Sequence, residues 1–290
     1  MKVQEIGTRG LLFTFDDPYK TNLYAINGEK FLFICDTFLG PDSMDEVIGE
    51  LKKKGFLPKP VIVFNSHHDY DHIWGNQCFK DSIILAHELC LEKIEMIGKK
   101  DLEDYKDHMK GDVQLTLPNV IFNNRVFFED ESIEFYHTPG HTEDSSSCFD
   151  HIDEVLFVGD NLETPIPYIR ILDISEYINT LEEYLEREPV IILSGHDNVM
   201  FTDEVLKENL NYLKEFQEGN VNRTKFTQKH NGIHFMNLQQ IGELLKERGD
   251  KIGSLSYYEE ALVVLEEFES SPQIENKIEL IKQIIEELKK

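Results

Sequence analysis

The chain has 290 residues, and its 29 Lys and Arg against 55 Asp and Glu give a formal net charge of −26. Such a surplus of acid repels phosphate backbones and anionic lipid surfaces, so we expect neither a nucleic-acid partner nor a membrane partner. Hydrophobic residues make up 40% of the chain, which is enough for a sizeable core and excludes wholesale disorder.

The length suits one large domain, or one domain with an appendage. No apolar run approaches the about 18 residues that cross a bilayer, and the N-terminus lacks the apolar stretch of a secretion signal. The four cysteines lie too far apart for a CxxC pair, so we expect them to be reduced. These features predict a cytoplasmic protein.

The first two hundred residues alternate short apolar runs with turn residues, which is typical of a layered α/β or α+β domain. Strands are expected at residues 11–15, 23–26, 30–35, 61–65, 82–86, 125–128, 133–137, 146–149, 155–158 and 190–193. Apolar residues at helical spacing predict helices at 42–54, 88–97, 176–188 and 203–218.

The composition changes after residue 222, and we predict a main domain at 1–222 with an extension at 223–290. Asn231-Gly232 lies between alternating residues and predicts a β-hairpin over 224–237. The pattern from 238 onward is helical, with a turn at 248–250, and resembles about one tetratricopeptide unit. Because such arrays usually need three or more repeats, we favour an ordinary helical hairpin packed on the main domain. It could also support a homodimer or bind a protein partner.

Four predicted strands each end in side chains that divalent metals accept as ligands. The first strand leads into His67-His68-Asp69-Tyr70-Asp71-His72. The others are followed by His141 in a Thr-Pro-Gly-His-Thr turn, by Asp160 after Gly159, and by His196 after Ser194-Gly195. Imidazoles and carboxylates that converge from strand ends indicate a metal centre.

This arrangement resembles the metallo-β-lactamase superfamily, whose run HxHxDH is followed by a histidine turn, an aspartate after glycine and a final histidine. The resemblance extends from about Thr21 to about Asn198. It implies an α+β fold, a four-layer αββα sandwich of two β-sheets between helices, with a small C-terminal helical extension. It also implies a site for two metal ions at one edge.

Carried over onto this sequence, the resemblance implies two sets of metal ligands. The first ion would be held by His67, Asp69 and His141, the second by Asp71, His72 and His196, and both by the carboxylate of Asp160. Two cations about 3.5 to 4 Å apart need a bridging anion, and a bridging hydroxide is the expected nucleophile. Among the site carboxylates we assign a catalytic role to Asp71.

The departure from the family run is Asp69, because the superfamily has its second histidine at that position. His68 is one residue early and is expected to point the other way, so it does not replace the ligand. The two divalent ions are expected to be zinc, and iron or manganese are alternatives because an anionic ligand makes the site harder. The change also resembles flavodiiron proteins, which are acidic at this position, but we find no flavodoxin-like half or glycine-rich phosphate loop.

Several further residues have two interpretations. Asp36 either orients a ligand histidine or is a turn residue at a strand end. Tyr70 and Trp74 either line the substrate cleft or, as we favour, anchor the helix that follows the first ligands. His230 and His234 are by default surface or satisfied histidines, or else they form a lid over the site.

The sequence therefore predicts a metal-dependent hydrolase that cleaves an ester, thioester, lactone or related bond of a small molecule. One alternative is a non-haem di-iron oxidoreductase that works with a separate flavoprotein. Another is a non-catalytic metal-binding or interaction protein.

Overall fold

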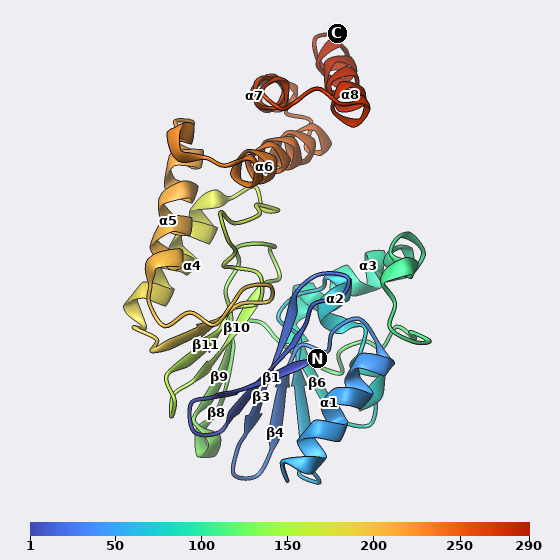
Figure 1. Ribbon diagram of the computed structural model, residues 1–290, viewed down its shortest axis with the longest axis vertical. Helices are drawn as coiled ribbons and strands as arrows, with labels where there is room; N and C mark the ends of the chain where they lie inside the picture. The colour runs from blue at the N-terminus through green and yellow to red at the C-terminus, as the bar shows by residue number, and fades with distance from the viewer. The chain divides into compact units, whose positions relative to one another are not determined.

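The computed structural model describes residues 1–290, and the chain divides into two compact units (Figure 1). The first unit comprises residues 1–139, 143–162 and 183–203 and holds both β-sheets. The second comprises residues 140–142, 163–182 and 204–290 and is helical apart from its loops. None of the helices has both the length and the apolar character needed to cross a bilayer.

The larger sheet has seven strands, which lie in sequence order. They are β1 (Lys2–Ile6), β2 (Gly10–Phe15), β3 (Thr21–Asn27), β4 (Leu32–Cys35), β5 (Val61–Phe64), β6 (Ile83–His87) and β7 (Val120–Phe122). The pairs from β1 to β4 are antiparallel, and those from β4 to β7 are parallel. The sheet is therefore mixed.

The smaller sheet has the order β12-β11-β10-β9-β8. Its strands are β8 (Arg125–Phe128), β9 (Ile133–His137), β10 (Ser146–Asp150), β11 (Val155–Phe157) and β12 (Ile191–Leu193). Only β11 and β12 pair in parallel, so their carboxyl ends lie side by side. The predicted strands are confirmed, and the structure adds β1 and β7, which pair at the two edges of the larger sheet.

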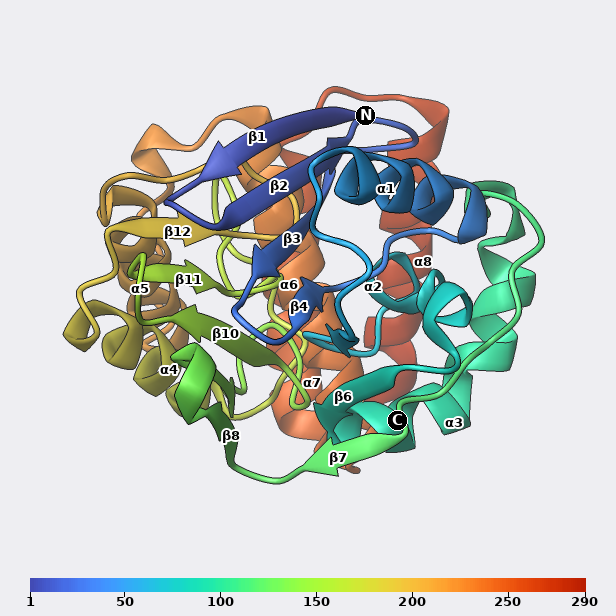
Figure 2. The same ribbon diagram turned by 90° about the horizontal axis from the view of Figure 1, so that it is seen from below.

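Two apolar layers hold the first unit together. Between the sheets, Phe33 and Phe64 of the larger sheet pack against Phe135 of the smaller one, with the Phe64 and Phe135 ring centroids 4.6 Å apart. On the other face of the larger sheet lie α1 (Pro41–Lys53) and α3 (Glu88–Asp104), which contribute to a second buried cluster (Figure 2). Alternation along the strands produces both layers, because neighbouring side chains point to opposite faces.

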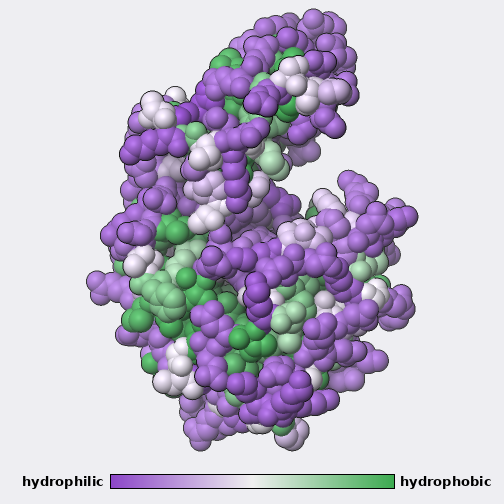
Figure 3. Space-filling view, viewed as in Figure 1, coloured by the Kyte–Doolittle hydropathy of each residue, from purple (hydrophilic) through white to green (hydrophobic).

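The predicted helices in the first two hundred or so residues are also confirmed. Besides α1 and α3, they are α4 (Ile174–Glu186) and α5 (Glu204–Gln217). The structure adds a short helix, α2 (Tyr70–Ile73), after β5. Two mixed sheets flanked by helices confirm the expected α+β sandwich. The face seen in Figure 3 is mostly hydrophilic, as the acidic composition predicts.

The last part of the second unit consists of α6 (Gln228–Glu247), α7 (Lys251–Glu266) and α8 (Pro272–Leu288). The expected turn at 248–250 is confirmed, since it separates α6 from α7. Gly242 lets these two helices approach closely, because a Cβ there would lie 3.1 Å from the ring of Tyr258. The tetratricopeptide-like interpretation and the division at residue 222 stay predictions.

The β-hairpin expected over residues 224–237 is wrong, because α6 begins inside that segment. Thr227 caps the helix, with its side chain accepting from the His230 backbone N–H while the His230 side chain accepts from the Thr227 N–H. Ile233 and Leu238 are buried along the helix. This reciprocal cap and apolar burial at helical spacing outweigh the local turn preference of Asn-Gly.

Candidate metal centre

The side chains predicted to bind metal follow the carboxyl ends of strands. His67 follows β5 after Asn65-Ser66, Asp160 follows β11, and His196 follows β12. Asp71 and His72 lie on α2, which begins directly after Asp69. Because β11 and β12 are parallel and adjacent, Asp160 and His196 are delivered to the same end of their sheet.

The Asp160 carboxylate lies among three imidazoles. Its Oδ2 is 3.1 Å from Nε2 of His196 and 3.7 Å from Nε2 of His67, while its Oδ1 is 3.4 Å from Nε2 of His72. His67, His72 and Asp160 each offer one atom within 4.8 Å of the others, and all three side chains are buried. The two oxygens of the Asp160 carboxylate therefore face three histidines between them.

Asp71, His72 and His196 form a second group of this kind. Oδ2 of Asp71 is 3.6 Å from Nε2 of His72 and 3.5 Å from Nε2 of His196. His72 belongs to both groups, so the two arrangements are contiguous.

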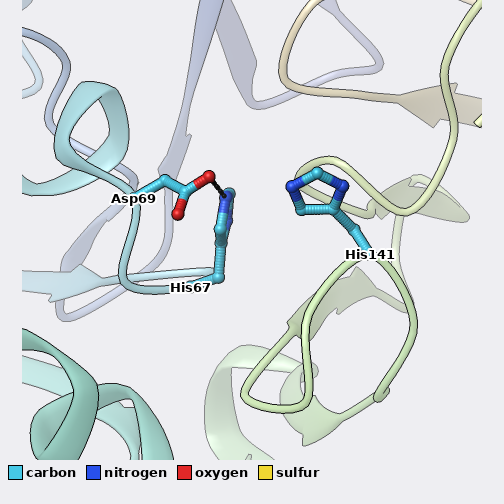
Figure 4. A group of neighbouring side chains, drawn as sticks. All are labelled: His67, Asp69 and His141. Atoms are coloured by element: carbon cyan, nitrogen blue, oxygen red, sulfur yellow. Dashed lines mark ion pairs between the residues drawn. The ribbon is translucent and has the colours of Figure 1, made fainter. Parts of the chain in front are cut away.

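Figure 4 draws three of the residues predicted to hold the first ion, namely His67 and Asp69 of the first unit and His141 of the second. The dashed line in Figure 4 joins His67 and Asp69, whose Nε2 and Oδ2 atoms are 3.4 Å apart. The departure from the family run therefore places a carboxylate beside His67. The assignment of all seven residues as metal ligands stays a prediction.

The structure confirms that Asp36 orients a histidine of the site. Asp36 lies just beyond β4, and its Oδ2 is 2.7 Å from Nδ1 of His72. The backbone N–H of Ser66 donates to Asp36 Oδ1, and the Ser66 hydroxyl donates to Oδ2, each at 2.7 Å. Since a carboxylate accepts, Nδ1 of His72 carries the proton and Nε2 faces Asp160 as an acceptor in the neutral ring.

His196 is oriented in the same way by the backbone, because its Nδ1 donates to the carbonyl of Lys20 at 2.6 Å. The loop that carries His196 is held by Asn22, whose side-chain amide donates to the carbonyls of Ser194 and Asp197 at 2.8 and 2.7 Å. This role of Asn22 was not predicted, since the two segments meet only in the fold.

Gly195 leaves room for the side chains of the site. A Cβ at Gly195 would lie 2.1 Å from Oδ1 of Asp160 and 2.8 Å from Cε1 of His72. Gly159 has a φ of +54°, and a Cβ there would lie 2.7 Å from the Ser66 hydroxyl oxygen. Glycine at these two positions lets backbone and side chains approach closely.

The electrostatics of the site favour a bound cation. Although burial acts in the opposite direction, the imidazoles of His196 and His72 hold the pKa of the Asp160 carboxyl well below its ordinary value. Burial disfavours a charged His72, but Asp160, Asp71 and Asp36 raise its pKa well above the ordinary value. The carboxylates around His72 thus favour positive charge at this place, and a bound metal ion would supply it.

The hydrogen bonding of the site also indicates that these side chains suit metal ions. Nε2 of His72 and Oδ1 of Asp160 are buried and face each other at 3.4 Å without making a hydrogen bond. Buried polar atoms without partners are costly, and imidazole Nε2 with carboxylate oxygen is a common ligand set for zinc and other divalent metals. The residues present therefore fit the metals that the resemblance implies.

In the second unit, His141 has two charged neighbours that sequence reasoning missed. Its Nδ1 is 3.6 Å from Oε1 of Glu163, and its Nε2 is 3.5 Å from Nη1 of Arg170. Glu163 is buried and fixed to α5, because its backbone N–H donates to the Asn209 side chain at 3.0 Å. No motif pointed to Glu163, since its position depends on the path of the 163–172 loop.

Tyr70 and Trp74 have the predicted packing role, although Tyr70 also has polar contacts. Trp74 is buried, and Tyr70 packs beside it with ring centroids 4.8 Å apart. The Tyr70 hydroxyl lies 2.7 Å from that of Tyr19, whose ring meets His196 edge-on. Tyr19 was not singled out in the sequence.

His230 and His234 have structural roles in α6. His230 contributes to the helix cap, and His234 is buried with its Nδ1 3.0 Å from the Tyr212 hydroxyl. Burial and the positive charge of Arg223 lower the pKa of His234 to about 4. Both histidines therefore contribute to the helical unit that carries them.

Comparison with known proteins agrees with this geometry. Residues 16–196 match the family model described as the metallo-beta-lactamase superfamily. A Drosophila melanogaster protein described as "Beta-lactamase-like protein 2 homolog" is 26% identical over 183 residues. That match covers 62% of this chain and 59% of the relative, so the chain spans less than two thirds of the relative's length.

Solved structures share the fold. The DIM-1 metallo-beta-lactamase superposes with a TM-score of 0.60 at 16% identity, covering 74% of this chain and 97% of that one. A metallo-beta-lactamase from Pontibacter korlensis gives 0.60 at 14% identity, covering 73% and 98%. The chain belongs to the metallo-beta-lactamase superfamily, whose members are generally hydrolases and typically bind divalent metal ions.

Proposed function

We propose that the protein is a hydrolase with a dinuclear metal centre that cleaves an ester, thioester, lactone or related bond of a small molecule. The observation that carries the proposal is the Asp160 carboxylate, which faces the Nε2 atoms of His67, His72 and His196 within 3.7 Å. His67, Asp69 and His141 would hold one ion, Asp71, His72 and His196 the other, and Asp160 would bridge them. Bound there, the ions would supply a bridging hydroxide nucleophile and polarise the scissile group.

The chain's own residues would complete the reaction. Asp36 and the carbonyl of Lys20 hold the Nδ1 protons of His72 and His196, so that their Nε2 lone pairs point inward. Asp71 lies 3.5 Å from Nε2 of His196 and would hold the proton that is passed to the leaving group.

The proposal is tested with protein purified without chelators. Elemental analysis is expected to find close to two divalent ions per chain, and Asp160→Ala is expected to lose most of them. A panel of generic thioester, lactone and phosphodiester substrates would then identify the bond class by metal-dependent turnover. Near-full metal occupancy in Asp160→Ala would overturn the bridging role.

We further propose zinc as the resident metal, with iron or manganese as alternatives because of Asp69. Its carboxylate lies beside His67, and an oxygen ligand favours harder metals than an imidazole does. Asp69→His is expected to shift the bound metal toward zinc, as measured by loading from an equimolar mixture of zinc, iron and manganese. Stoichiometric iron with oxygen consumption in the wild type would instead support the di-iron oxidoreductase.

A further inference from the structure

His68, which the ligand set leaves out, lies between two carboxylates. Its Nδ1 is 2.8 Å from Oδ1 of Asp144, and its Nε2 is 3.3 Å from Oδ1 of Asp69. A carboxylate oxygen only accepts hydrogen bonds, so each ring nitrogen of His68 faces an acceptor. The side chain is 3% exposed and has little freedom to turn away.

Asp144 fixes His68 from behind. Besides its contact with the ring, its Oδ2 accepts from the backbone N–H of His68 at 2.8 Å. The Asp144 side chain is fully buried, and Nζ of Lys93 lies 3.8 Å from its Oδ1. Although burial acts in the opposite direction, the hydrogen bond from His68 holds the pKa of Asp144 well below its ordinary value. Asp144 therefore stays an ionised anchor for both the backbone and the ring of His68.

The two oxygens of Asp69 face different histidines. Oδ1 faces His68, while Oδ2 is directed at Nε2 of His67, 3.4 Å away. Asp69 is also the residue before α2, but its side chain makes no helix-capping bond. A carboxylate has a broad terminal torsion, so a contact on one oxygen decides where the other oxygen points.

We propose that His68 and Asp144 are positioning residues that hold the Asp69 carboxylate toward His67 as a metal ligand. The inference rests on the proposed metal centre and deepens it, because it explains how an aspartate serves where the family run has a histidine. Partners of this kind typically change metal affinity by about 10-fold to 100-fold.

The test is metal affinity, measured on the full chain by competition with a chromophoric chelator using zinc and cobalt. His68→Leu removes both polar contacts, and we expect the affinity at one of the two sites to fall by about 10-fold to 100-fold. The visible spectrum of the cobalt-loaded protein is expected to change, because a ligand of one ion is displaced. His68→Gln, whose amide can still donate toward Asp69, is expected to recover part of the affinity.

His87→Leu is the matched control. His87 is also buried, stacks on His137 with ring centroids 3.8 Å apart, and lies outside the metal groups. A purely structural role of His68 would lower stability, as in His87→Leu, while both affinities and the cobalt spectrum stayed unchanged. That result would overturn the inference.

A second variant keeps the inference testable if His68→Leu does not fold. Asp144→Asn preserves volume and removes only the anchoring charge, and it is expected to weaken the same site. Unchanged affinity in Asp144→Asn would overturn the anchor role. If the proposed metal centre is wrong, the wild type itself will bind no metal. If only this inference is wrong, the wild type will bind metal and the variants will bind it with the same affinity.

Discussion

Oδ2 of Asp36 lies 2.7 Å from Nδ1 of His72, and this contact decides which imidazole nitrogen faces the Asp160 carboxylate. Asp36 adopts a left-handed backbone conformation with a φ of 65°, which turns its side chain back toward the Ser66 backbone. Aspartate and asparagine tolerate this conformation better than most residues do. The backbone geometry and the orientation of the histidine are therefore linked at one position.

Asp36→Asn is expected to lower metal affinity by about 10-fold to 100-fold, because an amide N–H facing Nδ1 favours the wrong tautomer of His72. Chelator competition measures the change. Asp150→Asn is the control, since Asp150 is equally buried but pairs with Arg9. Equal affinities in the two variants would contradict the orienting role.

Gly195→Ala is expected to disrupt the centre, because the added Cβ would lie 2.1 Å from Oδ1 of Asp160. Overpacking of this kind destabilises by about 1 to 3 kcal/mol, and displacement of Asp160 should also release metal. Denaturant unfolding and elemental analysis measure the two effects. Gly49→Ala, in α1 with nothing within 4 Å, is the control and should be stabilising if anything. Full metal content in Gly195→Ala would argue against the close approach.

The stability of the metal-free protein is expected to depend on His196. Burial disfavours its charged form, but the Asp160 carboxylate outweighs burial and raises the pKa of His196 to about 10 from 6.5. Because folding raises this pKa, protonated His196 stabilises the folded state. The stabilisation is complete below pH 6.5 and is lost as the pH rises through about 10. The urea midpoint of chelator-treated wild type should therefore exceed that of His196→Asn near neutral pH and approach it toward pH 10. If the two urea midpoints differed by the same amount from neutral pH to pH 10, protonation of His196 would not contribute to stability.

Asn237 is expected to be important for the stability of the second unit. Its side chain accepts from the Ile169 N–H and donates to the Pro167 carbonyl and the Tyr212 hydroxyl, at 2.9 to 3.0 Å. Asn237→Ala leaves buried partners unsatisfied and should lower the free energy of unfolding by about 1 to 3 kcal/mol. Asn211→Ala, which removes an exposed contact with Glu215, should change it little. Equal effects of the two changes would show that the buried contacts are not decisive.

The error over residues 224–237 shows where local sequence is ambiguous. Asn231-Gly232 favours a turn over a few residues, but the segment contributes to a helix whose buried face includes Ile233 and Leu238. At residues 248–250, by contrast, the local turn preference of the sequence predicted the break between α6 and α7 correctly. A short-range preference is decisive only where no packed face competes with it.

The sequence by itself determined the fold class, most strands and helices, and the residue types that gather at strand ends, because apolar periodicity and ligand chemistry are local properties. Only the tertiary structure paired Asp36 with His72, Asn22 with the His196 loop and Asp144 with His68. Those partners are far apart in the chain, and folding alone brings them within hydrogen-bonding distance. Hydrogen bonds depend on distances of tenths of an ångström, which no pattern of residue types encodes.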